Sequence, residues 1–472
     1  MSDLESIGEK CGVLSMARTG EIPSYMYYAL RAIQHRGQEA AGMALYDPDE
    51  KKIVVTKGLG LVEDVFRKQQ MESLKGCRGI GHTYYSLRLS TPENAQPHLI
   101  KTAVGDIALA HNGIIINSAQ LITELKSRGH AFVTDTEEEA MAYIIADELF
   151  LGNTVVKAMK VLAKRAIGSY SLSIMIGDRV FALRDPLGLR PLCLGKFKDG
   201  CGYIAASESA ALDVTDAELV RDVIPGELLE IKPDGIESSV VATLEKKGYC
   251  FFEHVYFSRT DSILEGNPVY ETRKRIGWRL AKDHPVGADI VIPIPDSGRA
   301  HAYGFSIASG IPMAEGLMKN RYVNRTFIMP DQKSRDMSVR EKLNPVRSEI
   351  EGKRVVLVDD SIVRGTTMRR IVNMVRGAGA KEVHVRIGSP PIIAPCYLGI
   401  DMTTRDQFIA DGKTVPEIAK AIGADSLGYT SIEGLIEALQ IDGKDLCLGC
   451  VSAEYPIKIE GEKERFQQRL EV

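Results

Sequence analysis

Two adjacent carboxylates, Asp359 and Asp360, stand where an apolar run ends in a polar loop. That loop carries hydroxyl, guanidinium and glycine residues: Ser361, Arg364, Gly365, Thr366 and Thr367. Amides and hydroxyls at the start of a helix bind phosphate, while paired carboxylates accept hydrogen bonds from vicinal hydroxyls or approach Mg²⁺. The stretch therefore indicates a site for a phosphorylated sugar. A solvated acidic turn and a phosphoacceptor site are the plainer alternatives.

The elements around this pair indicate a parallel sheet. The apolar run Val355 to Val358 lacks alternation, as in a strand buried on both faces. A helix is predicted from Met368 to Arg376, and the next strand from Glu382 to Ile387. This strand–helix–strand unit places the acids at the carboxyl end of the sheet, where open α/β sheets bind ligands. A second apolar strand, within residues 288–293, runs into the loop Asp296 to Arg299.

Cysteines supply the second group of candidate residues. Cys11 precedes the apolar run Val13 to Met16, where a small buried residue is the plain interpretation. Cys447 and Cys450 are separated by two residues, a modest signal for zinc, for an iron–sulfur cluster or for no metal. Eight cysteines in 472 residues are too few and too scattered for a disulfide framework. Metal binding or catalysis is the functional alternative for these thiols.

The composition limits the class of protein. A chain of 472 residues exceeds what one hydrophobic core usually supports, so two or three domains are expected. The formal net charge of −4 offers no basic field for nucleic acid or for an anionic membrane surface. The first ten residues are polar, and no apolar run is long enough to cross a bilayer. We expect a cytoplasmic protein without nucleic-acid or membrane partners.

Four motifs in the N-terminal third occur in a set order: IQHRGQEAAGMALYD from Ile33, GIGH from Gly79, LAHNG from Leu109 and TDTEEEAMAYII from Thr134. Together they resemble the class II glutamine amidotransferases. The resemblance implies an N-terminal-nucleophile fold, an αββα sandwich over residues 11–240, behind a propeptide over residues 1–10. Short strands between glycine and proline turns suit this architecture. Predicted strands in its second half cover Tyr170 to Ile176, Arg179 to Asp185 and Ala206 to Leu212.

The same resemblance implies a glutaminase site. Removal of the propeptide would give Cys11 a free α-amino group, with an ordinary pKa of about 7.7 to 8.0, as the base for its own thiol. Asn112 and the Gly113 amide would stabilise the oxyanion, and Asp135 would bind the α-ammonium group of glutamine. A simple turn at residues 111–113 and a helix cap at Asp135 are the structural alternatives.

One position departs from that family. Its members carry an arginine two residues after the histidine of GIGH, where it clamps the glutamine carboxylate, and this chain has Tyr84 there. A tyrosine hydroxyl does not replace a bidentate cation. We expect Arg88 to take over the carboxylate of glutamine, with Arg36 as a second candidate.

The stretch from Arg354 to Thr367 resembles the phosphoribosylpyrophosphate motif of type I phosphoribosyltransferases. The resemblance implies a second domain, with a parallel sheet and C-terminal helices, over residues 241–472, which makes the chain α/β and α+β in class. Its loop at Asp296 and Ser297 would bind pyrophosphate, and Mg²⁺ would be held by Ser297, Asp359 and Asp360. A basic segment would form a flexible flap over the diphosphate, with Arg325, Lys333 and Lys342. Helices are predicted over residues 269–282, 415–421 and 432–439.

The combination of both halves resembles the family of glutamine phosphoribosylpyrophosphate amidotransferases over nearly the whole chain. One branch of that family holds a [4Fe–4S] cluster at the positions of Cys250, Cys396, Cys447 and Cys450. The resemblance thus implies this cluster and Mg²⁺ as cofactors. The other cysteines outside the nucleophile position are expected to be structural: Cys77, Cys193 and Cys201.

The resemblance implies that glutamine, phosphoribosylpyrophosphate and water become 5-phosphoribosylamine, glutamate and pyrophosphate, the first committed step of de novo purine biosynthesis. Family members form homotetramers and are inhibited by purine nucleotides. One alternative is a phosphoribosyltransferase that uses free ammonia because Tyr84 impairs its glutaminase. Another is a non-catalytic regulator that senses phosphoribosylpyrophosphate. The intact set of Cys11, Asn112 and Gly113 argues against the regulator, as does the lack of a basic DNA-binding segment.

Overall fold

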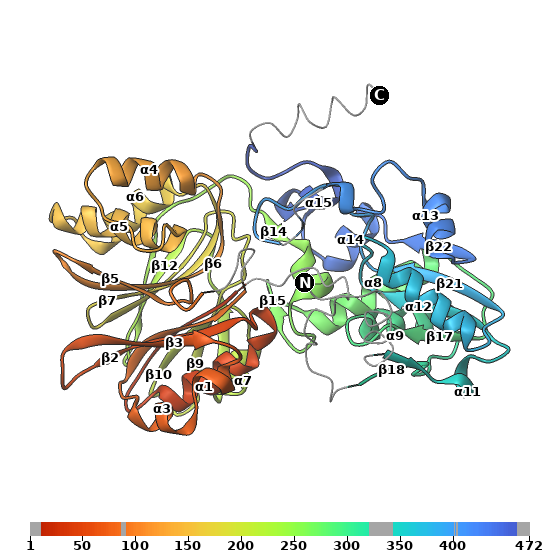
Figure 1. Cartoon of the computed structure of the whole chain (residues 1–472), viewed down its shortest axis with the longest axis horizontal. Coiled ribbons are helices and arrows are strands. Elements are labelled where there is room, and N and C mark those ends of the chain that lie inside the picture. The colour runs from red at the N-terminus through yellow and green to blue at the C-terminus, as the bar shows by residue number, and fades with distance from the viewer. Residues whose placement is uncertain (1–10, 86–90, 321–342, 401, 403–404, 460–472) are drawn as a thin grey trace.

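The computed structural model describes residues 11–85, 91–320, 343–400, 402 and 405–459. Two parts lie side by side, an N-terminal part with two stacked sheets and a C-terminal part around a smaller sheet (Figure 1). Within these described residues, no helix combines the length and the apolar character needed to span a bilayer. Three groups of predicted residues lie outside them: the propeptide, Arg88, and the flap residues Arg325, Lys333 and Lys342.

The first sheet of the N-terminal part has seven strands, all paired antiparallel. In spatial order they are β11 (Ala217–Asp222), β9 (Cys193–Phe197), β10 (Gly202–Ala206), β1 (Gly12–Arg18), β4 (Arg78–Tyr84), β2 (Ala40–Asp47) and β3 (Lys52–Leu59). Gly12 of β1 pairs with Thr83 of β4. Cys11 therefore lies next to the end of β4, close to Tyr84.

The second sheet has six strands, again all antiparallel. Their order is β13 (Ile236–Val240), β12 (Glu227–Ile231), β8 (Arg179–Arg184), β7 (Gly168–Ile176), β6 (Gly105–Ile115) and β5 (His98–Thr102). Asn112 and Gly113 lie on β6, opposite Ser171 and Tyr170 of β7. The strand β7 is thus the direct neighbour of the predicted oxyanion site.

Helices cover the outer face of each sheet (Figure 1). The first sheet carries α1 (Pro23–Ala32), the 3₁₀ turn η1 (Gln34–Arg36), α2 (Val62–Val65), α3 (Lys68–Ser73) and α7 (Ala210–Asp213). The second sheet carries α4 (Ser118–Ser127), α5 (Glu137–Phe150) and α6 (Val155–Arg165). Small residues such as Ala44, Ala108 and Ala182 pack between the two sheets. The predicted αββα sandwich is confirmed.

The predicted strand over Ala206 to Leu212 is wrong. β10 ends at Ala206, and the chain turns into the short helix α7 at Ala210. The Ser207 N–H still donates to the Val13 carbonyl oxygen at 3.1 Å, but the Val13 N–H donates to the Ser207 hydroxyl, at 2.9 Å. The next side chain, Glu208, is fully buried and accepts hydrogen bonds from His35 and Arg36. These side-chain contacts end the strand.

The sheet of the C-terminal part is parallel, as predicted. Its order is β17 (Ile290–Pro293), β20 (Arg354–Asp359), β21 (Glu382–Ile387) and β22 (Ser426–Tyr429). One face packs against α8 (Val269–Asp283), α9 (Gly298–Ser309) and α14 (Ile432–Leu439), and the other against α12 (Thr366–Gly377) and α13 (Val415–Ile422). The predicted helices are all present, and α12 begins two residues earlier than expected.

Short elements connect the two parts. β14 (Tyr249–Cys250) pairs in parallel with β23 (Leu446–Cys447), so the C-terminal segment returns to the junction. The junction also contains the π-helical turn η2 (Glu253–Phe257), β15 (Ile263–Leu264), β16 (Asn267–Pro268), η4 (Gly443–Asp445) and α15 (Gly449–Ser452). Near the sheet lie β18 (Leu317–Lys319), β19 (Leu343–Pro345), α11 (Arg347–Ile350) and η3 (Arg405–Gln407). Leu187 and Leu189 of the N-terminal part share one core with Phe251 and Phe252, so the two parts are packed together.

Candidate active sites

Asn112 and Gly113 form a polar site on β6. The Asn112 side chain is fully buried, and among the described residues neither of its amide atoms has a hydrogen-bond partner. Gly113 has a φ of 151°, and a Cβ at this position would lie 1.9 Å from the carbonyl oxygen of Ser169, so only glycine fits. A buried amide without a partner costs free energy unless a ligand satisfies it. The pair is suited to hold a ligand oxygen.

A buried network supports this strand from behind. The His111 N–H donates to Gln96 Oε1 at 2.6 Å, and His111 Nδ1 lies 3.1 Å from Glu138 Oε1. Gln96 Nε2 donates to the same Glu138 oxygen at 3.0 Å. His82 Nε2 on β4 lies 3.0 Å from the His111 carbonyl oxygen. The network thus connects α5 and both sheets to the residue before Asn112.

The charges in this network are set by burial and by pairing. Burial lowers the pKa of His82 to about 3, so its ring is neutral and Nε2–H donates to the His111 carbonyl. Burial alone would lower the pKa of His111, but the hydrogen bond and charge of Glu138 outweigh it and raise that pKa. Burial opposes ionisation of Glu138, yet His111 lowers the pKa of Glu138 to about 2. His111 and Glu138 therefore form a buried ion pair.

Cys11 directly precedes β1, the strand that pairs with the segment before Tyr84. Its Sγ lies 3.5 Å from the carbonyl oxygen of Tyr85, and the residue is only 7% exposed. The Tyr84 ring lies beside the His82 ring, with centroids 5.7 Å apart. The candidate nucleophile and the position that departs from the family pattern are therefore neighbours.

The two described candidates for glutamine binding differ. Asp135 is exposed, and its carboxylate lies 2.6 Å from Lys126 Nζ. Thr136, and not Asp135, caps α5, so the helix-cap alternative for Asp135 is wrong. Arg36 is buried, and its guanidinium donates to Glu208, Glu253 and Ser258. These contacts occupy all three nitrogens of Arg36, which argues against a role as the glutamine clamp.

The carboxyl ends of β17 and β20 bring the predicted Mg²⁺ ligands together. Gly298 starts α9, and a Cβ there would lie 2.4 Å from the carbonyl oxygen of Val358, so glycine lets the helix approach the end of β20. Ser297 makes a side-chain hydrogen bond to Asp359. Burial raises the pKa of Asp359 well above its ordinary value, and the neighbouring Asp360 carboxylate adds to that rise. Ser297, Asp359 and Asp360 offer side-chain oxygens as ligands, and oxygen ligands that include carboxylates suit Mg²⁺.

The loop after β20 is shaped for an anion. Asp360 is buried, and its Oδ2 accepts a hydrogen bond from Ser361 Oγ at 2.6 Å. Gly365 has a φ of 77° directly before α12, and a Cβ there would lie 2.2 Å from Ile409 Cδ1. Thr366 and Thr367 form the first turn of this helix, and the N-terminal end of a helix attracts anions. Acids and helix amides thus lie at one edge of the sheet.

The other predicted residues of this edge already have partners. Arg364 donates to Gln407 Oε1 through its guanidinium. Asp296 lies 2.9 Å from Lys319 Nζ and 3.7 Å from Arg299 Nε. Lys319 begins the stretch KNRYVNRTFIMP, residues 319–330, which belongs to the basic segment predicted to form the flap. The pyrophosphate loop therefore contacts the start of that segment.

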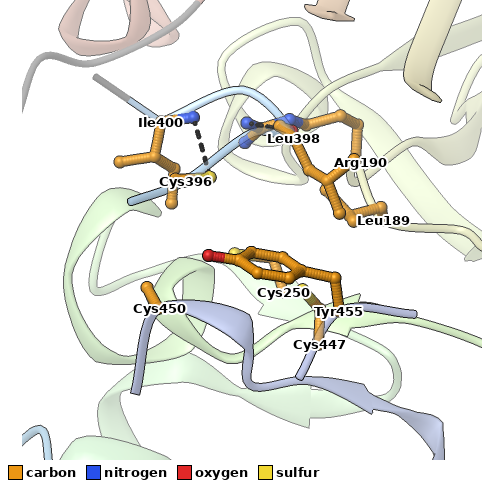
Figure 2. Close-up of a pocket in the computed structure, with 9 residues that line it drawn as sticks. All are labelled: Leu189, Arg190, Cys250, Cys396, Leu398, Ile400, Cys447, Cys450 and Tyr455. Carbon is orange, nitrogen blue, oxygen red and sulfur yellow. Dashed lines mark hydrogen bonds between the residues drawn. The ribbon is translucent and has the colours of Figure 1, made fainter. Parts of the chain in front are cut away.

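The four cysteines predicted to hold a cluster line one pocket at the junction: Cys250, Cys396, Cys447 and Cys450 (Figure 2). Cys250 and Cys447 are paired across β14 and β23, and the Ile400 N–H donates to Cys396 Sγ at 3.3 Å. Burial raises the pKa of Cys250 to about 12, and it raises that of Cys450 as well. The part of the chain that the structure describes contains no group of three metal-ligand side chains in binding geometry. Four thiols from three segments nevertheless match the donor set of a [4Fe–4S] cluster.

Several residues of these sites carry no recognisable signal in the sequence. Glu138 lies in a run of three acids, which suggests only a favourable first helical turn. Gln96, Ser169 and Arg190 are single polar residues without a recognisable spacing. Their roles come from packing between elements, which a pattern in one segment does not reveal.

Two family profiles match the chain in the order of its two parts. Residues 84–214 match a profile described as a glutamine amidotransferase domain. Residues 260–387 match a profile described as a phosphoribosyl transferase domain. The first covers β6 and α5, and the second covers β17, β20 and their loops. Asn112, Gly113, Asp135 and the acids and phosphate loop after β20 thus lie within the matched regions, whereas Cys11, Arg36 and the four pocket cysteines lie outside them.

Curated relatives and solved structures match nearly the whole chain. The amidophosphoribosyltransferase of Methanocaldococcus jannaschii is 50% identical over 468 residues, covering 96% of this chain and 98% of the relative. That of Bacillus subtilis is 42% identical over 467 residues, covering 97% and 96%. A solved structure described as glutamine phosphoribosylpyrophosphate amidotransferase from B. subtilis, complexed with ADP and GMP, has a TM-score of 0.89 and 42% identity. It covers 96% of this chain and 98% of its own.

Proposed function

The chain belongs to the amidophosphoribosyltransferase family, and on that premise we propose how its residues divide the reaction. The enzyme converts glutamine, phosphoribosylpyrophosphate and water into 5-phosphoribosylamine, glutamate and pyrophosphate. This is the first committed step of de novo purine biosynthesis. The observation that carries the assignment is identity of 42% and 50% to amidophosphoribosyltransferases over nearly the full length of both parts.

We propose that the N-terminal part releases ammonia through a thioester on Cys11. Removal of residues 1–10 leaves Cys11 with a free amine, which takes the proton from its thiol. The thiolate attacks the carboxamide carbon of glutamine, and the oxyanion receives hydrogen bonds from the Asn112 amide and the Gly113 N–H. Ammonia leaves, and water then releases glutamate. The buried amide of Asn112, which has no partner within the described part of the chain, supports this role.

Glutamine is oriented at its two charged ends. Asp135 receives the α-ammonium group, which takes the place of Lys126 at its carboxylate. Arg88 binds the α-carboxylate in place of the arginine that family members carry at the position of Tyr84. Of the two candidates for the α-carboxylate, we favour Arg88, because the Arg36 guanidinium is already bonded to Glu208 and Glu253. Loss of activity toward glutamine in Arg88→Ala is the expected result.

The C-terminal part binds phosphoribosylpyrophosphate at the sheet edge. The first turn of α12, with Gly365, Thr366 and Thr367, binds the 5-phosphate, and Asp359 and Asp360 accept hydrogen bonds from the ribose hydroxyls. The loop at Asp296 and Ser297 holds the pyrophosphate, and Ser361 and Arg364 complete the site. Ammonia attacks C1 with inversion, its nitrogen–carbon bond forms, and pyrophosphate leaves with the bonding electrons. The flap residues Arg325, Lys333 and Lys342 exclude water.

Two cofactors fit the side chains. Ser297, Asp359 and Asp360 would hold Mg²⁺, which when bound neutralises the charge developing on pyrophosphate. Cys250, Cys396, Cys447 and Cys450 would hold a [4Fe–4S] cluster, whose contribution is to tie the C-terminal segment to the junction. We also propose a homotetramer, cytoplasmic location and inhibition by purine nucleotides. The last proposal is supported by the related B. subtilis structure, which is complexed with ADP and GMP.

Pyrophosphate release with two nitrogen donors tests this division of labour. We expect the wild-type protein to release pyrophosphate with glutamine and with ammonium, and Cys11→Ala to do so with ammonium only. Release with ammonium only in the wild type would instead indicate a glutaminase impaired at Tyr84. Release with neither donor, despite binding of phosphoribosylpyrophosphate, would indicate the non-catalytic regulator.

A further inference from the structure

One carbonyl oxygen joins the two parts of the chain. Leu398 O accepts a hydrogen bond from Ser169 Oγ at 2.7 Å and another from Arg190 Nη2 at 3.0 Å. Ser169 and Arg190 belong to the N-terminal part, whereas Leu398 belongs to the loop that carries Cys396. Figure 2 shows Leu398 and Arg190 together on the same side of the pocket as Cys396. The N-terminal part thus holds this loop by its backbone.

Ser169 also touches the predicted oxyanion strand. It pairs with Ile114 in the ladder between β7 and β6, and its Oγ lies 3.4 Å from the Ile114 N–H. Its carbonyl oxygen lies 3.4 Å from His111 Nε2 and packs against Gly113, where a Cβ would come within 1.9 Å. The residue is completely buried. A shift of Ser169 therefore moves the residues on both sides of Asn112.

Arg190 fixes the same loop from a second direction. Its side chain is buried, and Nη1 lies 3.2 Å from Glu253 Oε1, a carboxylate that also pairs with Arg36. Gly399 has a φ of 117°, and a Cβ there would lie 2.0 Å from Arg190 Nη2. Glycine at this position allows the guanidinium to lie against the loop. The loop is thus held by a cation whose own position is fixed by Glu253.

We propose that Ser169 is a positioning residue for the glutaminase, because it holds the Asn112–Gly113 strand against the Cys396 loop through the Leu398 carbonyl. Arg190 fixes that carbonyl. A change in the Cys396 loop would then reach the oxyanion donors without any contact with glutamine. The inference rests on the oxyanion role proposed for Asn112 and Gly113.

Ser169→Ala tests the link, with Ser173→Ala as the matched control. Ser173 is buried on the same strand, and among the described residues its hydroxyl has no hydrogen-bond partner. We expect Ser169→Ala to lower kcat for glutamine hydrolysis roughly tenfold, since small misplacements of catalytic groups cost that much or more. The KM for glutamine and the ammonia-dependent rate should stay close to those of Ser173→Ala, while Tm should fall slightly because one buried hydrogen bond is lost.

A second variant tests the same contact with a substitution in the C-terminal part. Gly399→Ala should displace Arg190 or the loop and lower kcat with glutamine while the ammonia-dependent rate persists. If both Ser169→Ala and Gly399→Ala match the control in kcat with glutamine, the positioning role is wrong. An equal loss of the ammonia-dependent rate in these variants would also overturn the positioning role, because it would show that the whole enzyme is disrupted. Asn112→Ala tests the oxyanion role separately from the positioning role of Ser169. Full glutamine activity in that variant would refute the proposed oxyanion site.

Discussion

A fully buried amide without a hydrogen-bond partner is costly. The Asn112 side chain is such an amide, since no residue that the structure describes bonds to it. Alanine at this position would remove the cost, so the side chain is best explained by a ligand. Gly113 adds a second constraint, because its neighbour Ser169 leaves no room for a Cβ. Both residues were predicted from a short motif, LAHNG, although the motif alone is equally compatible with a turn.

Asn112→Ala should reduce kcat with glutamine by about 10²- to 10³-fold, the usual loss for one oxyanion donor. The ammonia-dependent rate should not change, because that reaction bypasses the thioester. Steady-state assays with the two donors on one preparation measure both rates. Equal loss with both donors would contradict the oxyanion role.

The role of Cys11 as its own base depends on its amine. We therefore expect the intact mass of the purified active protein to lack Met1 to Lys10. An amide nitrogen is not a base, so a chain that keeps this segment should not hydrolyse glutamine. A protein with full glutamine activity that retains all ten residues would refute the amine mechanism. Cys11→Ala, which should keep the segment if processing needs the thiol, is the companion sample.

At the scale of elements, α5 supports β6 through the His111–Glu138 ion pair. We expect Glu138→Gln to destabilise the protein by about 1.5–3 kcal/mol, because a charged hydrogen bond inside the core is weakened. It should also lower kcat with glutamine, since His111 precedes Asn112. Glu148→Gln, on the same helix, is the control, because the Glu148 carboxylate accepts a hydrogen bond from Asn153 Nδ2 at 2.8 Å outside this network. Urea unfolding at several pH values measures the difference.

The pH range of this stabilisation follows from the two shifts in pKa. The pKa of Glu138 falls from 4.5 to about 2 on folding, so its contribution is present above pH 4.5 and is lost as pH falls toward 2. The pKa of His111 rises above 6.5 on folding, so its contribution is present below pH 6.5 and is lost as pH rises through the folded value. The difference between wild type and Glu138→Gln should therefore be largest between about pH 4.5 and 6.5. A difference that keeps growing toward pH 2 would contradict the ion pair.

The sequence predicted the elements better than their contacts. The uninterrupted apolar run before Asp359 identified β20, and the sheet, its helices and the phosphate loop followed from it. The strand predicted over Ala206 to Leu212 was wrong because Ser207 and Glu208 are bonded to residues 194 and 172 positions away. The same reason hid Ser169 and Arg190, which act through one carbonyl in the other part. Long-range polar contacts leave no local pattern.

At the scale of the whole molecule, the cysteine pocket joins both parts. We expect anaerobically purified protein to show the broad visible absorption of an iron–sulfur cluster and about four iron atoms per chain, as for a [4Fe–4S] centre. Cys396→Ser should lose this absorption and lower Tm, because the loop is then held only through the Leu398 carbonyl and no longer through a cluster ligand. Cys77→Ser is the control, because Cys77 is partly exposed and lies outside the pocket. A colourless sample with stoichiometric zinc would exclude the cluster.

Ammonia released at the glutaminase site must reach the phosphoribosylpyrophosphate site for the full reaction to occur. We therefore expect glutamine hydrolysis to depend on bound phosphoribosylpyrophosphate. The most direct test is to measure glutamate and pyrophosphate in the same reaction, with glutamine as the only nitrogen source and Mg²⁺ present. We predict equal amounts of the two products, and little glutamate when phosphoribosylpyrophosphate is omitted. Glutamate formed without pyrophosphate, or no glutamate at all beside ammonium-dependent pyrophosphate release, would contradict a coupled amidophosphoribosyltransferase.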